Sequence, residues 1–336
     1  MSRALILTLA LLLACMAAAL AIGRYPIPLA TLVSGMGIGN GPVDPVAQML
    51  LWHERLPRVI AAVLVGAGLG SAGASFQGVF RNPLVAPDLL GVLAGSGCGA
   101  AAAILLELPV AARMGLTFAG GLVAVALGIG IARLFGGREQ DGNDAGGPLL
   151  LVFGGIVSGA LCTALLSLAK YVADPENTLP DIVFWLLGSL AQIDGAALWV
   201  IGPVLAGGIA MLVGCGRFLD FLALSDDEAM SLGVPVAPLR LGVVVLATAV
   251  CALTVSIAGT IGWVGLVIPH VARLMTGAAH ARLMPLSAAL GAVFLVVADT
   301  LARSLIASEI PIGIVTDLVG VLAFLVMLPR VRRGWS

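Results

Sequence analysis

The chain has 336 residues, of which 60% are hydrophobic and only 10% are charged, and its formal net charge is −1. Soluble domains carry about 25% charged residues, so this composition excludes an ordinary soluble protein, and the near-zero net charge gives no indication of nucleic-acid binding. The length is sufficient for about ten membrane spans of ~20 residues each, so we predict an all-α polytopic membrane protein with a single transmembrane domain over residues 1–336.

The first predicted span covers residues 4–22, a continuous apolar run behind Arg3. The small residues Ala17–Ala19 leave a cleaved signal peptide as an alternative, but the run is long enough to cross a bilayer. We therefore predict a retained first helix with a cytoplasmic N-terminus. Residues 24–50 are rich in Pro, Gly and Asn, which predicts an external loop with a short surface helix.

The next three predicted spans carry many small residues and cover residues 56–79, 89–107 and 114–135. Glycine and alanine allow helix backbones to approach closely in lipid, and the chain has 44 glycines. We therefore expect a tightly packed bundle. The polar stretch 136–147 that follows predicts an aqueous loop.

The second half of the chain alternates apolar spans with short polar connections. Residues 174–181 predict an aqueous turn, and residues 184–190 predict a short interfacial or re-entrant helix. The acidic stretch 216–238 predicts a short amphipathic helix with Leu222, Ala229 and Leu232 on one side. The remaining predicted spans lie at 148–169, 195–214, 240–258, 259–270, 284–302 and 314–328.

The positions of the basic residues predict the orientation. With the N-terminus inside, six of the 17 Lys and Arg residues lie outside and eleven inside. The external six are Arg24, Arg55, Arg58, Arg113, Lys170 and Arg303. This bias follows the positive-inside rule, so we predict a multi-pass membrane protein with both termini cytoplasmic.

The chain contains one lysine, Lys170, and it does not lie in a GxxxxGK[ST] motif. A P-loop needs that lysine to reach the β- and γ-phosphates, so any ATP-driven step requires a separate polypeptide. The five cysteines are scattered singly through apolar runs, which predicts small buried hydrophobes and no metal site. No Ser/His, paired-Asp or HExxH constellation supports an intramembrane enzyme. We predict no catalysis and no cofactor in this chain.

Two acidic residues, Asp299 and Asp317, lie within apolar runs. A carboxylate inside a membrane usually marks an ion or proton path. Asp299 precedes Arg303 by four residues, which predicts a local ion pair on one helix face. An ion-coupled secondary transporter that uses Asp299 or Asp317 stays open as the alternative function.

Seven motifs occur in order along nearly the whole chain, and each is weak alone. They are RLPR (55–58), FQGVFRNPL…PDLLGV (76–92), FWLLGSL (184–190), LSDDEAMSLGV (224–234), GLVIPHVARL (265–274), ADTLAR (298–303) and EIPIGIVT (309–316). Together they closely resemble the FecCD-type family, the permease subunits of ABC importers for iron-siderophore complexes, haem and cobalamin.

The resemblance implies a type II ABC importer permease fold of about ten helices. It also implies that the protein lies in the bacterial cytoplasmic (inner) membrane and moves a metal chelate across it by alternating access. It implies four kinds of partner: a second permease subunit, identical or paralogous, two cytoplasmic ATPase subunits that bind ATP and Mg, a periplasmic or lipid-anchored substrate-binding protein, and membrane lipid. A ferric siderophore is the first candidate cargo, although haem, cobalamin and molybdate-type oxyanions would use the same scaffold.

The resemblance also implies roles for particular residues. Residues 222–235 match the segment that couples the permease to the ATPase, with Leu224, Ser225, Asp226, Asp227, Glu228, Ala229, Leu232 and Gly233 as its candidates. Arg55 and Arg303, assisted by Arg58, match external arginines that meet the binding protein, and Asn82 and Leu84 match the inner constriction of the path. The alternatives are a solvated loop and snorkelling interfacial arginines.

The chain departs from the family pattern in its last helix. It reads GVLAF at residues 320–324, where Gly-x-Pro-x-Phe is common, and it has Asp317 where a small residue is common. These positions lie on a helix expected to line the path, so the cargo stays open.

Overall fold

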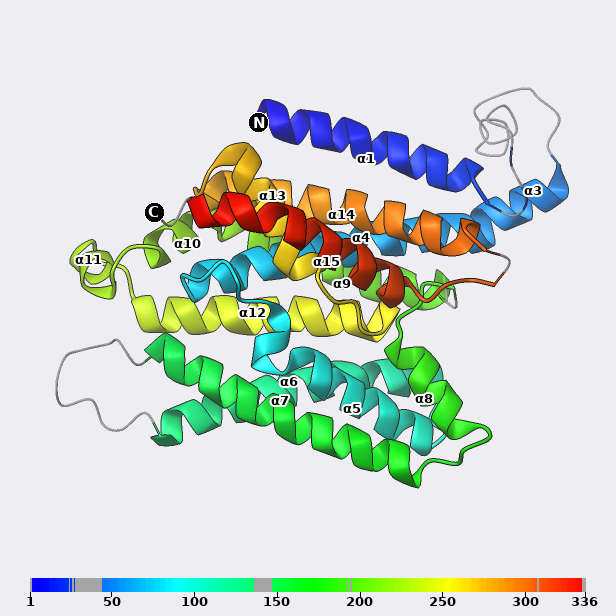
Figure 1. Cartoon of the computed structure of the whole chain (residues 1–336), viewed down its shortest axis with the longest axis horizontal. Helices are drawn as coiled ribbons and strands as arrows, with labels where there is room; N and C mark the ends of the chain where they lie inside the picture. Colours follow the sequence, from blue (N-terminus) through cyan, green and yellow to red (C-terminus); the bar gives the residue numbers. More distant parts are fainter. Residues whose placement is uncertain are drawn as a thin grey trace.

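The computed structural model describes residues 2–23, 25, 27, 44–135, 147–191, 193, 195–306 and 308–333 (Figure 1). Within these residues the regular structure is helical and contains no β-strand. Seven helices are long and apolar enough to cross a membrane. Three shorter apolar helices accompany them, at Val92–Leu105, Val264–Thr276 and Ile312–Met327. The prediction of an all-α protein with about ten membrane helices is thereby confirmed.

The helices follow the apolar runs closely, and most of their bounds lie within a few residues of the predicted spans. In chain order they are α1 (Arg3–Ala21), α3 (Pro45–Met49), the π-helix η1 (Leu50–Arg55), α4 (Leu56–Val79), the 3-10 helix η2 (Pro87–Leu90), α5 (Val92–Leu105), α6 (Val110–Phe135), α7 (Gly147–Val172), α8 (Thr178–Leu186), α9 (Gly195–Gly214), α10 (Gly216–Leu222), α11 (Asp226–Ser231), α12 (Val236–Ala258), α13 (Val264–Thr276), α14 (His280–Ser304) and α15 (Ile312–Arg333).

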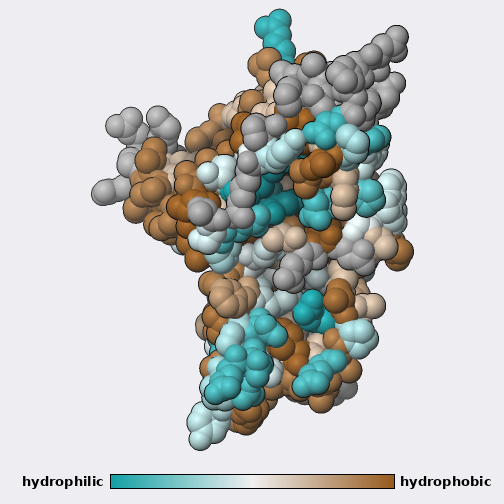
Figure 2. Space-filling view, turned by 90° about the vertical axis from the view of Figure 1, so that its right-hand side faces the viewer, coloured by the Kyte–Doolittle hydropathy of each residue, from teal (hydrophilic) through white to brown (hydrophobic). Residues whose placement is uncertain are grey.

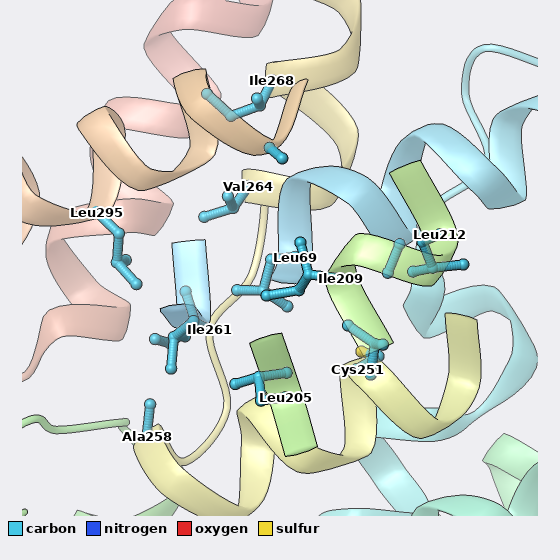
Figure 3. Packing of buried hydrophobic residues seen from close by; sticks show 14 of the residues in the cluster. Leu69, Leu205, Ile209, Leu212, Cys251, Ala258, Ile261, Val264, Ile268 and Leu295 are labelled. Carbon is cyan, nitrogen blue, oxygen red and sulfur yellow. The ribbon is translucent and has the colours of Figure 1, made fainter. Parts of the chain in front are cut away.

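The helix α4 lies at the centre of the bundle. It packs against α9, α12, α13 and α14, while α1 lies along α14, and α5, α6 and α7 form a group beside α12 (Figure 1). Buried side chains of the neighbouring helices surround Leu69 of α4, among them Leu205 of α9 and Cys251 of α12 (Figure 3). In lipid, close packing of this kind replaces exclusion of water as the force between helices.

Small residues bring α4 very close to two of its neighbours. A Cβ atom on Gly66 would lie 2.2 Å from the carbonyl oxygen of Gly291 in α14. A Cβ atom on Gly73 would lie 2.0 Å from the carbonyl oxygen of Gly265 in α13. Neither contact leaves room for a side chain, so the tight bundle predicted from the glycine content is found at the centre of the molecule.

The short helix predicted at 184–190 begins earlier, at Thr178, and ends at Leu186. The second half of the predicted aqueous turn at 174–181 is therefore helix. The turn is compact because the carboxylate of Asp174 accepts the backbone N–H of Asn177 at 2.8 Å, which completes the reversal before the helix begins. Pro180 then falls in the first helical turn, where a missing N–H removes no helical hydrogen bond.

The helix α13 continues to Thr276, although its span was predicted to end at Pro269-His270. Pro269 has no N–H, so the carbonyl group of Gly265 loses its usual helical donor. That carbonyl oxygen is the one that lies against Gly73 of α4. Close packing by the neighbouring backbone therefore accommodates a proline that would end an isolated helix.

Two predictions fall partly outside the described residues. The polar loop at 136–147 lies almost entirely outside them, and so does most of the external loop at 24–50. The short surface helix predicted within the second loop is α3, but it is not separate. It continues through η1 into α4, so that residues 45–79 form one long helical stretch.

The elongated bundle has two ends, which we name by their contents. The α11 end carries α10, α11, the start of α1 and the end of α15 (Figure 1). The arginine end carries Arg55, Arg58 and Arg303, together with α3 and α8. Figure 2 faces the arginine end and shows hydrophilic residues gathered on it, with hydrophobic surface at the flanks. Apolar flanks and polar ends are what an integral membrane protein requires.

Candidate functional site

The acidic segment predicted as one short helix forms two, α10 and α11, which are separated by a break at residues 223–225. A capping box starts α11. Ser225 Oγ accepts the backbone N–H of Glu228 at 3.2 Å, and the carboxylate of Glu228 accepts the backbone N–H of Ser225 at 3.0 Å. This reciprocal pair satisfies two otherwise free donors. The turn after α11 ends at Gly233, whose φ of 79° favours glycine.

The two short helices bury one set of apolar residues and expose another. Leu222 and Ala229 are buried, whereas Leu224, Met230 and Leu232 are exposed. The prediction that Leu222, Ala229 and Leu232 lie on one side of a helix is therefore wrong for Leu232. The helix α11 ends at Ser231, so Leu232 lies beyond its regular face. We call the exposed residues Leu224, Met230 and Leu232 the coupling patch. Met230 was not predicted as a member.

The three acidic residues of α11 differ in their surroundings. Asp227 and Glu228 are exposed. The side chain of Asp226 is only 10% exposed and lies between two guanidinium groups, those of Arg81 and Arg240. One nitrogen of Arg240 is 2.8 Å from both carboxylate oxygens, and Arg81 contacts one of them. Asp226 therefore binds within the chain, whereas its two neighbours are exposed, although one oxygen of Glu228 also takes part in the capping box.

Arg81 belongs to the turn that ends α4, within the RNPL motif. Its Nε also donates to the carbonyl oxygen of Leu222, at 2.7 Å, so that one side chain holds the end of α10 and the start of α11. The backbone of Arg81 has φ of 51°, in the left-handed region that a non-glycine residue seldom adopts. This turn directs the guanidinium toward α11.

The same turn holds Asn82 and Leu84, the predicted inner constriction. The side-chain oxygen of Asn82 accepts the backbone N–H of Leu84 at 2.9 Å, and both residues are exposed at the α11 end. A role in gating stays a prediction.

The charged state of α11 is fixed by its hydrogen bonds. Partial burial opposes ionisation of Asp226, but the hydrogen bonds and charges of Arg240 and Arg81 outweigh it and hold the pKa of that carboxyl below its ordinary value. The hydrogen bonds from Ser225 likewise hold the pKa of the exposed Glu228 below its ordinary value. Both groups are therefore anionic at neutral pH.

The three predicted docking arginines lie together at the other end, but two of them are turned inward. Arg55 is 7% exposed and donates to the carbonyl oxygens of Leu20, Ala21 and Tyr25, at the end of α1. Arg303 is 8% exposed and donates to another carbonyl of the same helix end. The two arginines satisfy carbonyl groups that a helix end leaves free. Their contact with a binding protein stays a prediction.

The third arginine, Arg58, joins two acidic residues. It is 2.9 Å from the buried carboxylate of Asp299 and 3.0 Å from that of Glu309. The ion pair predicted between Asp299 and Arg303 is present at 3.7 Å, but Arg58 is the nearer partner. Asp299 is therefore held by two cations. Glu309, which was not predicted as a member, is the part of this cluster that reaches the surface.

Asp317, the other predicted intramembrane acid, is exposed on α15 and has no hydrogen bond or ion pair to a described residue. Its carboxylate would lie 2.8 Å from a Cβ atom at Gly262. Gly262 lines a cavity of about 260 Å³ together with Leu69, Asp88 and Trp263. A larger cavity, of about 460 Å³, lies at the arginine end and includes Glu309 in its lining.

Residues 11–330 match the family described as the FecCD transport family. The molybdate import system permease protein MolB of Haemophilus influenzae is 38% identical over 87% of this chain and 84% of its own length. The Fe(3+) dicitrate transport system permease protein FecD of Escherichia coli is 34% identical over 99% of this chain and 100% of its own.

A solved structure described as an inward-facing conformation of an ABC transporter of the metal-chelate type has the same fold. It superposes with a TM-score of 0.85 at 36% identity, over 97% of this chain and 98% of that chain. Together with the helix order and the match over residues 11–330, this likeness settles the family. This integral membrane protein belongs to the FecCD transport family, with the fold of a type II ABC importer permease.

Proposed function

We propose that this chain is the permease subunit of an ATP-binding-cassette importer that moves a metal chelate across the bacterial inner membrane by alternating access. The observation that carries the proposal is the α11 segment. A capped helix presents exposed acidic residues and an exposed apolar coupling patch at one end of a membrane bundle. The chain itself has no P-loop lysine, so ATP and Mg would be bound by two separate ATPase subunits.

The two ends of the molecule support an orientation. The start of α1, the end of α15 and α11 share one end, which we assign to the cytoplasm. The arginine end then faces outward, where a periplasmic or lipid-anchored binding protein would dock. Because Arg55 and Arg303 are buried in this conformation, docking through them requires the end of α1 to move, whereas docking through the exposed Glu309 needs no such movement.

Family membership supports our proposal for the remaining partners and the class of cargo. The importer would contain a second permease subunit, identical or paralogous, and Asn82 and Leu84 would lie near the inner mouth of the path between the two. A ferric siderophore is our first candidate cargo, since an iron dicitrate permease aligns over 99% of this chain. Because another relative is a molybdate import permease, an oxyanion is also a candidate cargo.

The ion-coupled alternative is less well supported. A carboxylate that carries an ion must exchange it, but Asp299 is held by Arg58 and Arg303. Breaking an ion pair in such a buried setting is costly because it leaves an uncompensated charge. Asp317 is exposed and stays the only candidate of the original two for that mechanism.

Reconstitution tests the proposal. The chain would be purified with the subunits that accompany it in its native membrane and placed in proteoliposomes containing ATP, with radiolabelled ferric hydroxamate and ferric citrate as probe cargo. We expect uptake that requires ATP and the binding protein, and no ATP hydrolysis by the chain alone. Accumulation by the chain alone under a proton or sodium gradient would overturn the proposal. Mass spectrometry of the cargo on the copurified binding protein would identify it.

A further inference from the structure

One carboxylate joins three separate parts of the α11 end. Asp226, the first residue of α11, receives hydrogen bonds from Arg81, which follows α4, and from Arg240, which lies in the first turns of α12. We call these three residues the ionic joint. Arg81 and Asp226 are 145 positions apart in the chain, so the joint is formed by the fold and not by local sequence.

Two residues of the joint, Asp226 and Arg240, are enclosed, unlike the acidic residues beside them. The side chains of Asp226 and Arg240 are each 10% exposed, and that of Arg81 is 33% exposed. A carboxylate in such a place, with both oxygens bound, has little capacity left for a partner protein. Asp227 and Glu228, one and two positions later, are exposed.

The joint also fixes backbone positions on both sides of the break between α10 and α11. Arg81 binds the carbonyl oxygen of Leu222 as well as Asp226, and the capping box holds the start of α11 rigid. A push on α11 therefore cannot be absorbed by the break alone. It is transmitted to the end of α4 and the start of α12.

The helix that receives this push packs backbone to backbone against two of its neighbours. The glycine contacts of α4 with α13 and α14 leave no space between the backbones. The helices therefore cannot slide past one another unless they first separate. Movement of the end of α4 would thus carry α13 and α14 with it. The residues that contact an ATPase and the residues that transmit its movement are consequently different ones.

On this basis, and resting on the proposed function, we infer that Asp226 is a positioning residue. It transmits movement of α11 to α4 and α12 through Arg81 and Arg240, while Asp227, Glu228 and the coupling patch make the contact with the ATPase. The role differs from that of an ATPase-contacting residue because it acts after the ATPase has bound.

The experiment separates binding from transmission in the full complex. It uses the ATPase subunits and the binding protein, with its native cargo bound, that copurify with the wild-type chain. Three quantities are measured: the affinity of the permease for the ATPase, the stimulation of ATP hydrolysis by the loaded binding protein, and the cargo taken up per ATP hydrolysed. For Asp226→Asn we expect ATPase affinity within twofold of wild type and at least a tenfold loss of uptake per ATP.

The neighbouring substitution provides the contrast. Asp227→Asn removes the same charge one position later, and we expect it to weaken ATPase affinity several-fold. Asp226→Glu retains a carboxylate and should recover part of the lost uptake. Arg133→Gln, at an exposed arginine of α6 without an ion pair to a described residue, controls for charge at the same end and should match wild type in all three quantities.

Two further variants test the joint if Asp226→Asn fails to assemble. Arg81→Gly suits the positive φ of that turn, so its effect reports loss of the side chain and not of the backbone conformation. Arg240→Lys keeps the charge but not the two-oxygen contact. Both should lose uptake per ATP while retaining ATPase affinity.

Wild-type uptake per ATP in Asp226→Asn, or a loss of ATPase affinity equal to that of Asp227→Asn, would overturn the inference. Absence of ATP-driven uptake in the wild-type complex would instead overturn the proposed function. The two failures are therefore distinguishable.

Discussion

At the scale of single residues, the buried arginines of this protein join helices. Arg55 and Arg303 bind carbonyl oxygens of α1, and Arg58 binds carboxylates of α14 and of the turn before α15. Arginine suits such places because its fork of donors reaches several acceptors and keeps its charge when buried. Of the charges within apolar runs, Asp299 thus has a structural explanation, and Asp317 does not.

Substitution of Asp299 tests this explanation. Asp299→Asn leaves Arg58 and Arg303 without their buried counter-charge, so we expect a loss of about 3 kcal/mol in the free energy of unfolding. Thermal unfolding in detergent micelles would measure the loss. Asp181→Asn, at an exposed residue in the first turn of α8, is the control and should cost less than about 1 kcal/mol. Equal effects of the two variants would contradict a special role for Asp299.

The pH dependence of the ionic joint follows from the direction of the Asp226 pKa shift. A carboxyl group with a lowered pKa in the folded state contributes stability above its ordinary value of about 3.9, and the contribution disappears as pH falls through the lowered pKa. The stability difference between wild type and Asp226→Asn should therefore be constant from about pH 5 to pH 8. A difference that shrinks as pH falls from 7 to 5 in parallel unfolding measurements would contradict the lowered pKa.

At the scale of helices, the sequence predicts the long spans well because an apolar run of sufficient length has few alternatives in a bilayer. The spans at 56–79 and 195–214 coincide with α4 and α9. The exceptions involve prolines. Pro180 lies in a segment predicted as a turn, but it falls in the first turn of α8. Pro269 lies at the predicted end of a span, but the helix continues, and the carbonyl group of Gly265 that the proline leaves unpaired lies against α4. The sequence alone does not show that α4 lies against this carbonyl group.

The contact at Gly73 provides a test at this scale. In Gly73→Ala the new Cβ atom would lie 2.0 Å from the carbonyl oxygen of Gly265, so α4 and α13 must separate, and we expect loss of folded protein in fluorescence-detected chromatography. Gly207→Ala in α9, where a Cβ atom meets no atom within 4 Å, is the matched control. It should be neutral or slightly stabilising because alanine has the higher helix propensity.

At the scale of the whole molecule, the sequence predicts the location of the functional segments better than it predicts the directions of their side chains. The motif at 224–234 identified α11, and RLPR and ADTLAR identified the arginine end. The directions of the side chains were not predictable, because Asp226 faces inward only through partners 145 and 14 positions away. Arg81 was present in a quoted motif, but no local spacing indicated its partner.

The attachment of α1 to the bundle through Arg55 and Arg303 can be tested at this scale. We expect Arg55→Gln with Arg303→Gln to release the end of α1 and to increase maleimide labelling of the half-buried Cys15, four residues before Ala19. The fully buried Cys251 provides an internal control and should stay unlabelled. Unchanged Cys15 labelling together with weaker binding-protein affinity would instead assign the two arginines to docking alone.

The two arginines at the end of α1 also reach their places at different times during synthesis. Arg55 follows Leu20 by 35 residues, whereas Arg303 follows Ala19 by 284. At about 5–20 residues per second, the ribosome adds Arg55 within about 2–7 s of its partner, but adds Arg303 only about 14–57 s after its own. Arg55 can therefore close the end of the first helix early, while the contact with Arg303 must wait until almost the whole chain has been made.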